Sequence, residues 1–190
     1  MTLVFDTETT GIPRRRHGVY DPQTAADFDG ARLVSISWKL ADSAPKTFVV
    51  RPEGFEIPEF ISRIHGITHK FATENGHSLA DVLRDFLADV QAATVLVAHN
   101  IDFDLAIVRS ELYRVLPGTA HLNLSTCANF CTMLRGQEIL RLPKWPKLHE
   151  LYRLLTGTDP EFDRLHRAEY DIICCAVCYD ALALRAEKTK

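Results

Sequence analysis

The order of elements along the chain predicts an α/β protein in which one mixed sheet is flanked by helices. An apolar run at residues 2–8 is typical of a buried strand, and two β-branched runs at 32–42 and 46–52 follow it. No helical pattern separates these three runs, so they are expected to form a meander. From residue 78 onward, helical patterns alternate with a short strand at 94–98. Opening strands without helices between them do not suit a doubly wound sheet, and the order instead favours a ribonuclease H-like arrangement.

The first two helices are predicted from apolar side chains that recur every three or four positions. The first covers about 78–90, where Ser78 and Asp81 have the spacing of a capping box. After a turn at residues 99–100, a second helix is expected to bury one apolar face. That face consists of Leu105, Val108, Leu112 and Leu116.

The rest of the chain is expected to be irregular at first and helical at the end. Residues 117–146 show no regular pattern. A short helix follows at 147–156, with Gly157 as its C-cap. A long amphipathic helix from about Ala168 to Glu187 closes the chain.

Length and composition indicate a single domain spanning residues 1–190, with a polar connection at 12–30 inserted after the first strand. Hydrophobic residues make up 46% of the chain and charged residues 25%, which is ordinary for a globular protein. No apolar run is long enough to cross a membrane and no export signal opens the chain, so the expected location is the cytoplasm. The net charge of −3 argues against coating nucleic acid by bulk electrostatics, but it is compatible with an enzyme that handles one phosphate at a time.

The five cysteines are an odd number without an export signal, so reduced thiols are expected. Cys175 and Cys178 have the spacing of a zinc or redox pair. No second pair of this spacing exists, and the pair falls in the middle of a predicted helix. Small core residues on a helix are therefore the favoured interpretation.

Two carboxylates end the first strand. Asp6 and Glu8 are two residues apart, so their side chains lie on one face, about 7 Å apart. Like charges this close disfavour each other's ionised form. A nearby base, a solvated loop or a bound cation would make the arrangement favourable.

A second acidic patch, residues 97–104, stands where the 94–98 strand turns into a helix. Asp102 is placed as an N-cap. Asp104 falls in the first helical turn and is the better metal-ligand candidate. The alternative is that Asp104 only complements the helix dipole.

The third patch, residues 166–171, leads into the last helix. His166 is expected in the loop before that helix and Asp171 in an early turn. A histidine beside an acid can act as a general base. Taken alone, the patch is better explained as an exposed loop histidine and a dipole-complementing aspartate.

Taken together and in this order, "FDTETTG", "VAHNIDFD" and "HRAEYD" resemble the three motifs of the DEDDh, or DnaQ-like, exonuclease superfamily. That branch includes polymerase proofreading subunits and ribonuclease T. The segments "RIHGIT", "CTM" and "KWPKLHELY" are similar to intermediate elements of the family. The resemblance covers essentially the whole chain.

The resemblance implies a metal-dependent 3′–5′ exonuclease. Its four acids, Asp6, Glu8, Asp104 and Asp171, would hold two Mg²⁺ or Mn²⁺ ions, because hard oxygen ligands suit those cations better than zinc. Such ions lie ~3.5–4 Å apart and stabilise charge on the scissile phosphate and the leaving 3′ oxygen. His166 would take the proton from the attacking water, and a nucleoside 5′-monophosphate would leave.

The resemblance also implies a pocket for the terminal nucleotide. The backbone at Thr9 would receive the 3′-OH, Ile12 would wedge beside the terminal base, and His65, Asn100 and Phe103 would line the pocket. Apolar contact with a base is tolerant of sequence. Each of these residues has a structural alternative, Ile12 and Phe103 as core and His65 and Asn100 as turn formers.

The partner is expected to be the 3′ end of a nucleic acid, with single-stranded DNA favoured. An exoribonuclease of the same family and a non-catalytic binding module on this fold are the alternatives. Arg14–Arg16 either contact substrate phosphates or form a solvated loop. The sequence leaves open whether the chain forms a homodimer or joins a polymerase.

Two zinc patterns are rejected from the sequence. "HGITH" spaces His65 and His69 by four, but Gly66 and Thr68 disfavour a helix there. "HELYR" lacks the second histidine of a zinc-binding HExxH motif.

Overall fold

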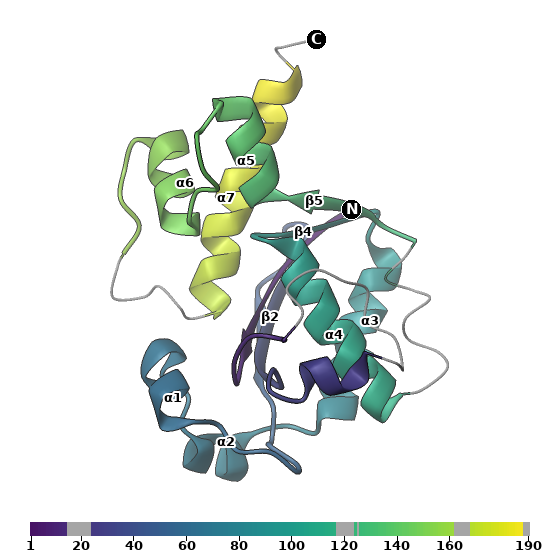
Figure 1. Ribbon diagram of the computed structural model, residues 1–190. Coiled ribbons are helices and arrows are strands. Elements are labelled where there is room, and N and C mark those ends of the chain that lie inside the picture. Colours follow the sequence, from purple (N-terminus) through teal and green to yellow (C-terminus); the bar gives the residue numbers. More distant parts are fainter. Residues whose placement is uncertain (15–23, 117–123, 125, 162–167, 188–190) are drawn as a thin grey trace.

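The computed structural model describes residues 1–14, 24–116, 124, 126–161 and 168–187. Its strands form one five-stranded sheet in the order β3-β2-β1-β4-β5 (Figure 1). The first three strands pair antiparallel, whereas β1, β4 and β5 run parallel to one another. The predicted meander and mixed sheet are therefore confirmed. The strands are β1 (Thr2–Thr9), β2 (Leu33–Leu40), β3 (Lys46–Val49), β4 (Val95–Ala98) and β5 (Ala128–Cys131).

Helices cover both faces of this sheet. One face carries α3 (Leu79–Ala92) and α4 (Ile101–Val115), and the other carries α7 (Ala168–Glu187) with α5 (Thr132–Leu140) and α6 (Leu148–Thr156) beside it (Figure 1). Two short helices, α1 (Glu59–His65) and α2 (His69–Asn75), lie at the opposite end of the molecule from α5 and α6. A short 3₁₀ helix, η1 (Ala25–Phe28), precedes β2.

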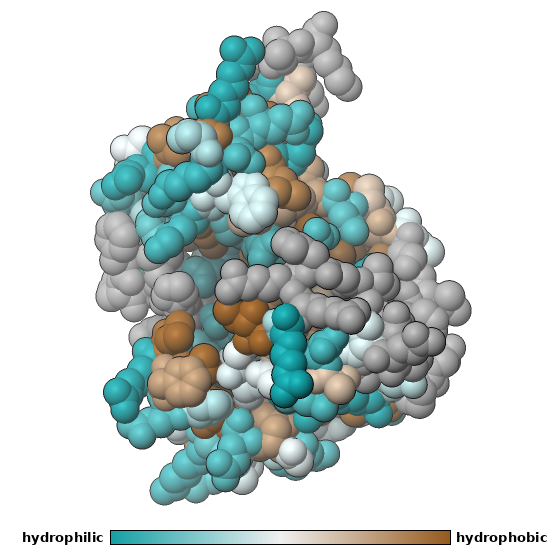
Figure 2. All heavy atoms as spheres, in the orientation of Figure 1, coloured by the Kyte–Doolittle hydropathy of each residue, from teal (hydrophilic) through white to brown (hydrophobic). Residues whose placement is uncertain are grey.

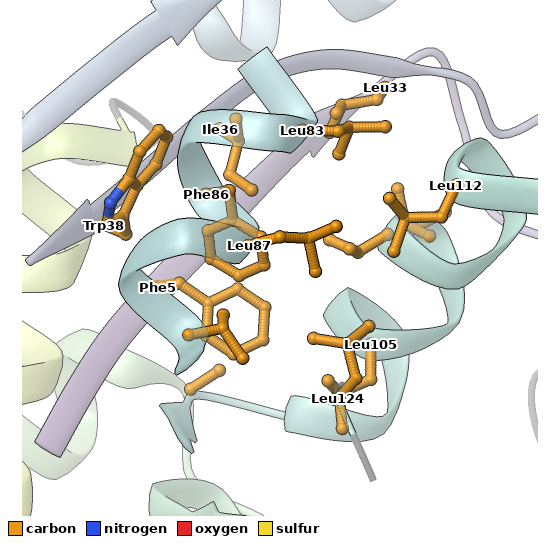
Figure 3. Packing of buried hydrophobic residues seen from close by; sticks show 14 of the residues in the cluster. Phe5, Leu33, Ile36, Trp38, Leu83, Phe86, Leu87, Leu105, Leu112 and Leu124 are labelled. Carbon is orange, nitrogen blue, oxygen red and sulfur yellow. The ribbon is translucent and has the colours of Figure 1, made fainter. Parts of the chain in front are cut away.

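The larger core lies between the sheet and the α3–α4 pair. Phe5 of β1 and Phe86 of α3 are fully buried, and their ring centroids are 5.5 Å apart (Figure 3). Trp38 of β2 meets Phe86 edge-on, at 5.4 Å between ring centroids. On the opposite face a smaller cluster joins Val4 and Val97 to Ile172 and Cys175 of α7. Burial on both faces makes β1 the central strand of the fold.

The predicted long helices have the expected bounds, but their caps differ from the expectation. Ser78 is the N-cap of α3, yet its side chain makes no capping hydrogen bond. Asp81 stands where a capping box needs the longer Glu or Gln, so the reciprocal bond does not form. The expected N-cap at Asp102 is wrong, because α4 begins two residues earlier, after the N-cap Asn100, which is in the left-handed conformation at φ 71°. Asparagine tolerates that conformation better than most residues.

The expectation that 117–146 is irregular is wrong for residues 128–140, which form β5 and α5. Strand β5 is only four residues long and mostly exposed, so it shows no apolar alternation. Helix α5 contains Gly136, which weakens a helical pattern. A Cβ at this position would lie 2.7 Å from the Leu151 side chain of α6, so that side chain would have to move aside for any other residue.

Helices α1 and α2 were not predicted. Gly66 ends α1 at φ 79°, and Thr68 caps α2 by accepting from the N–H of Phe71 at 3.1 Å. His65 and His69 consequently lie on different helices, which confirms that "HGITH" is not one helical metal motif. Within the described part of the chain, no helix is long and apolar enough to cross a membrane.

Candidate active site

The site begins with the alternation of β1. Leu3 and Phe5 point to the α3–α4 core, so Val4, Asp6 and Glu8 project from the other face. Val4 packs against α7, and the two carboxylates continue the same row toward the carboxyl end of the strand. The strand register shifts between Glu8 and Thr9, at an irregularity of the kind that re-aims side chains near functional sites.

Helix α7 brings a third carboxylate to this row. Asp171 lies in the first turn of α7 and is 8% exposed. Carboxylate oxygens of Asp6, Glu8 and Asp171 all lie within 4.8 Å of one another. These three residues, named below as the acidic cluster, are the one group with metal-ligand geometry among the described residues.

Asp104 approaches the acidic cluster from the other side of the sheet. It lies in the first turn of α4 and is 3% exposed. Strand β4 pairs with β1 only alongside Thr2–Val4, and beyond that pairing the N–H of Thr7 donates to Asp104 Oδ1 at 3.1 Å. The Thr7 hydroxyl donates to the same oxygen at 2.7 Å. These bonds hold Asp104 beside the cluster but outside its set of mutual contacts.

Burial and like charge make Asp6, Glu8 and Asp104 weak acids in the protein alone. Burial raises the pKa of Glu8 to about 8, and the charges of Asp171 and Asp104 add to that effect. The pKa of Asp6 is raised well above its usual range, first by burial and then by the three neighbouring acids. Burial also raises the pKa of Asp104 to about 7, although the Thr7 hydrogen bonds oppose this.

A bound cation would reverse these shifts. Buried like charges are costly unless they are paired or coordinate a metal. The donor set consists of carboxylate oxygens alone, which is the chemistry that Mg²⁺ and Mn²⁺ prefer. The residues present therefore fit a divalent cation site.

His65, at the end of α1, has an unsatisfied donor. Its side chain is 6% exposed, and Nδ1 accepts from the N–H of Ile67 at 3.1 Å. Burial lowers the pKa of His65, so the ring is neutral and its proton lies on Nε2. Nε2 has no hydrogen-bond partner among the described residues. An unpaired buried donor usually serves a ligand or ordered water.

The other predicted pocket residues have mixed environments. Thr9 directly follows the cluster, and its hydroxyl donates to the carbonyl of Gly11 at 2.6 Å. Ile12 is 62% exposed, which does not match its alternative as a core residue. Phe103 is half-buried against the larger core, and Asn100 lines a pocket beside Asp6 and Asp171. His166, Arg15 and Arg16 fall outside the described residues, whereas Arg14 is exposed.

The cysteines are structural in the region described. All five are free thiols, and four of them are buried. Burial raises the pKa of Cys178 to about 12 and that of Cys175 well above its usual range, so neither is a ready thiolate ligand. This environment agrees with the interpretation of the pair as core.

One wall of the site has no role predicted from the sequence. The pocket that contains Asn100 is also lined by an exposed tryptophan and its neighbours at 145–149. The sequence indicates only that this stretch is similar to a segment of the family. The tryptophan at position 145, next to Pro146, is the signal that could have identified the wall.

A mixed sheet of this topology, with carboxylates gathered at the end of its central strand, defines a ribonuclease H-like nuclease. The RNase_T family, described as exonuclease, matches residues 3–179. The chain belongs to this family of DnaQ-like, DEDDh exonucleases, and the assignment made from its sequence motifs is confirmed.

Individual relatives are distant. The chain is 27% identical over 144 residues to the DNA polymerase III subunit epsilon of Buchnera aphidicola, which covers 74% of this chain and 54% of that protein. It therefore spans about half the length of this curated relative. Exonuclease X, solved in complex with 5′ overhanging duplex DNA, is 25% identical with a TM-score of 0.62, and the match covers 97% of this chain and 92% of that one.

A further structural match supports the fold alone. Escherichia coli exonuclease I in complex with a dA16 oligonucleotide is 18% identical, with a TM-score of 0.71. That match covers 98% of this chain and 41% of the other. The ribonuclease H-like fold predicted from the element order is thus confirmed.

Proposed function

We propose that this protein is a 3′–5′ exonuclease that releases nucleoside 5′-monophosphates from single-stranded DNA. The observation that carries the proposal is the convergence of Asp6, Glu8 and Asp171 within 4.8 Å, with Asp104 beside them. Family membership supports the class of reaction, and the DNA complexes of exonuclease X and exonuclease I support the choice of DNA.

The four acids would hold two divalent cations, Mg²⁺ or Mn²⁺. When bound, these ions would supply Lewis-acid stabilisation of charge on the phosphate and on the leaving oxygen. Thr7 would keep Asp104 oriented through its two hydrogen bonds. His166, which precedes α7 in the chain, would accept the proton of the attacking water.

The terminal nucleotide would lie on the α1 side of the acidic cluster. The buried Nε2–H of His65 is a donor suited to a polar atom of the nucleotide. Ile12 of the β1 loop and Phe60 and Ile64 of α1 are exposed, and Figure 2 shows hydrophobic side chains gathered over α1. Apolar contact of this kind accepts any base. Thr9 and Phe103 would complete the pocket, and Asn100 would stand at its boundary with the pocket that borders Asp6 and Asp171.

A strand-degradation assay tests the proposal. DNA and RNA oligonucleotides of one sequence, labelled at the 5′ end, are incubated with the protein and Mg²⁺, Mn²⁺ or EDTA. We expect a metal-dependent ladder that shortens from the 3′ end, faster on DNA, and loss of the ladder in Asp171→Asn and His166→Ala. Asp102→Asn is the matched control, because Asp102 is an exposed acid in the same helical turn as Asp104.

Each other outcome has a defined meaning. Faster degradation of RNA would make the protein an exoribonuclease. Binding of both strands without cleavage under any metal would make it a non-catalytic binding module.

A further inference from the structure

A pocket of about 470 Å³ opens beside the acidic cluster, on the side away from α1. Its volume lies within the range of small-ligand sites. Its walls come from the β4–α4 turn, from α5 and from the segment that leads into α6. Its lining includes Asp6 and Asp171 of the acidic cluster, His99 and Asn100 of the turn, and Trp145 and Lys147 of the segment before α6.

The wall formed by residues 145–149 is fixed in place by His99. Nε2 of His99 lies 3.0 Å from the carbonyl oxygen of Pro146, and Nδ1 lies 3.0 Å from the hydroxyl of Thr132. A carbonyl only accepts, so Nε2 carries the proton and Nδ1 accepts from Thr132. Burial lowers the pKa of His99 to about 4, which keeps this neutral form in place.

The residue after Pro146 is fixed as well. The N–H of Lys147 donates to Glu150 Oε2 at 2.9 Å, which anchors the start of α6. Pro146 itself is buried, whereas Trp145 and Lys147 on either side of it are exposed. The wall therefore presents two outward side chains from a rigid backbone.

Trp145 is a surface that the fold does not use. It is 54% exposed, whereas the chain's other tryptophan, Trp38, is fully buried and packed against Phe48 and Phe86. An exposed indole beside a pocket is a stacking surface for an unpaired base. The exposed ammonium of Lys147 borders the same pocket and suits a phosphate.

The position of the pocket indicates the direction in which a bound nucleic-acid strand would run. Along β1, Asp6 comes first and Glu8 and Thr9 follow, toward the proposed site of the terminal nucleotide. The described lining of the pocket includes Asp6 and Asp171 but not Glu8. The α1 end and the α5–α6 end lie at opposite sides of the molecule (Figure 1). A strand with its last nucleotide at the α1 end would thus extend across the carboxylates into this pocket.

We infer that this pocket holds the nucleotide on the 5′ side of the scissile phosphate, with its base stacked on Trp145 and a phosphate beside Lys147. The inference rests on the proposed exonuclease function. It adds a requirement to that function, because a base stacked on Trp145 cannot be paired. The last two nucleotides of the substrate must then be unpaired.

The first test removes the base and the indole separately. The rate of the first cleavage is measured on an oligonucleotide with an abasic penultimate position and on one abasic six positions from the 3′ end. In the wild type, the penultimate lesion should lower kcat/KM roughly 5- to 150-fold relative to the distal lesion. Trp145→Ala should lower kcat/KM on the intact oligonucleotide by a similar factor. In this variant, the kcat/KM values on the two abasic oligonucleotides should be nearly equal.

Two further variants serve as controls for this comparison of Trp145→Ala with the wild type. Trp145→Phe keeps an aromatic face and should retain most of the discrimination. Leu154→Ala, which truncates another exposed apolar side chain of α6, should behave as the wild type. If Trp145→Ala leaves the wild-type discrimination intact, the inference is overturned. If the wild type cleaves no strand at all, it is the proposed function that fails.

The second test uses fluorescence and needs no turnover. In Asp171→Asn with Mg²⁺, the dinucleotide pdTpdT should quench Trp145 emission, whereas dTMP should not, because dTMP would fill only the terminal site. Trp38 is buried and contributes a constant background. Equal quenching by both would place the terminal base on Trp145, and quenching by neither would leave the pocket without a base; either result overturns the inference.

Discussion

The two faces of β1 use the same strand for opposite purposes. On one face, Leu3 and Phe5 are fully buried among apolar side chains of α3 and α4. On the other, Asp6 and Glu8 are gathered with Asp171 under α7. Burial of apolar surface stabilises a fold, whereas burial of like charges costs free energy. A single strand thus carries both the largest packing gain and the concentration of unfavourable charge on which the proposed chemistry depends.

The sharpest way to separate the two faces is to neutralise one acid. Asp6→Asn should lower kcat/KM on an oligonucleotide by roughly 10³-fold or more, since cation-mediated stabilisation of the transition state is worth several kcal/mol. The same change should not lower the melting temperature of the metal-free protein at pH 8, because it removes a repelling charge. Thermal melts and first-cleavage rates measure the two effects. A stability loss that matches the activity loss would show that Asp6 acts mainly in folding.

A substitution in the apolar core tests the other face of β1. Phe86→Ala should lower the free energy of unfolding by about 3–5 kcal/mol, because it leaves a cavity against Phe5 and Trp38. Urea denaturation measures this loss. The rate per folded molecule should stay within about twofold of the wild type. A large loss of rate at temperatures where the variant is folded would contradict the independence of the two faces.

A smaller effect on kcat/KM is expected at His65. Substitutions there can separate the structural role of Nδ1 from the proposed ligand-binding role of Nε2. The side-chain oxygen of His65→Asn can replace Nδ1 as the acceptor for the N–H of Ile67, but the variant lacks the Nε2 donor. We expect kcat/KM to fall roughly 3- to 100-fold through loss of one hydrogen bond to substrate, with little change in melting temperature. His65→Gln, whose amide reaches the Nε2 position, should lose less. Full activity of His65→Asn would show that the Nε2 donor of His65 does not contact the substrate.

A pH dependence of stability in the metal-free protein tests the acidic face of β1 without any substitution. The pKa of Glu8 is raised from 4.5 to about 8, so the native state keeps a proton that the unfolded chain releases. The free energy of unfolding should therefore fall as pH rises from about 4.5 to about 8. For a pKa raised from 4.5 to about 8, the loss is on the order of 4 kcal/mol at pH 8, and thermal melts of the metal-free protein at pH 5.5 and pH 8 measure it.

Divalent cations should reverse that trend. Because cations compete with protons for the same oxygens, Mn²⁺ should raise the melting temperature more at pH 8 than at pH 5.5. Asp6→Asn should flatten both dependences. Metal-free stability that rises over this pH range would contradict the buried cluster of like charges.

The sequence predicted the regular core and the acids well, for local reasons. Strand β1 and helix α3 carry strong apolar patterns, and their buried faces follow from those patterns. The carboxylates stand at the ends of strands and helices. The order of the three motifs along the chain indicates their shared function, which the spacing within a single motif does not. That Asp6, Glu8 and Asp171 approach within 4.8 Å depends on how α7 crosses the sheet, which no local pattern encodes.

The elements and residues that were missed depend on tertiary contacts. Strand β5 is a short, exposed edge, and the Gly136 of α5 lies against the Leu151 side chain of α6. The 145–149 wall is irregular in sequence, and its rigidity comes from the ring of His99, 47 residues earlier than Pro146. Such a contact has no signature in either segment taken alone.

Calorimetric titration with Mn²⁺ determines whether the four acids hold divalent cations. The wild type and the Asp102→Asn control, in the presence of dTMP, should each bind two Mn²⁺ per chain at pH 8, and Asp6→Asn should lose this binding. If the wild type binds no Mn²⁺, or if Asp6→Asn binds it as tightly as the wild type, the acidic cluster is not a metal centre.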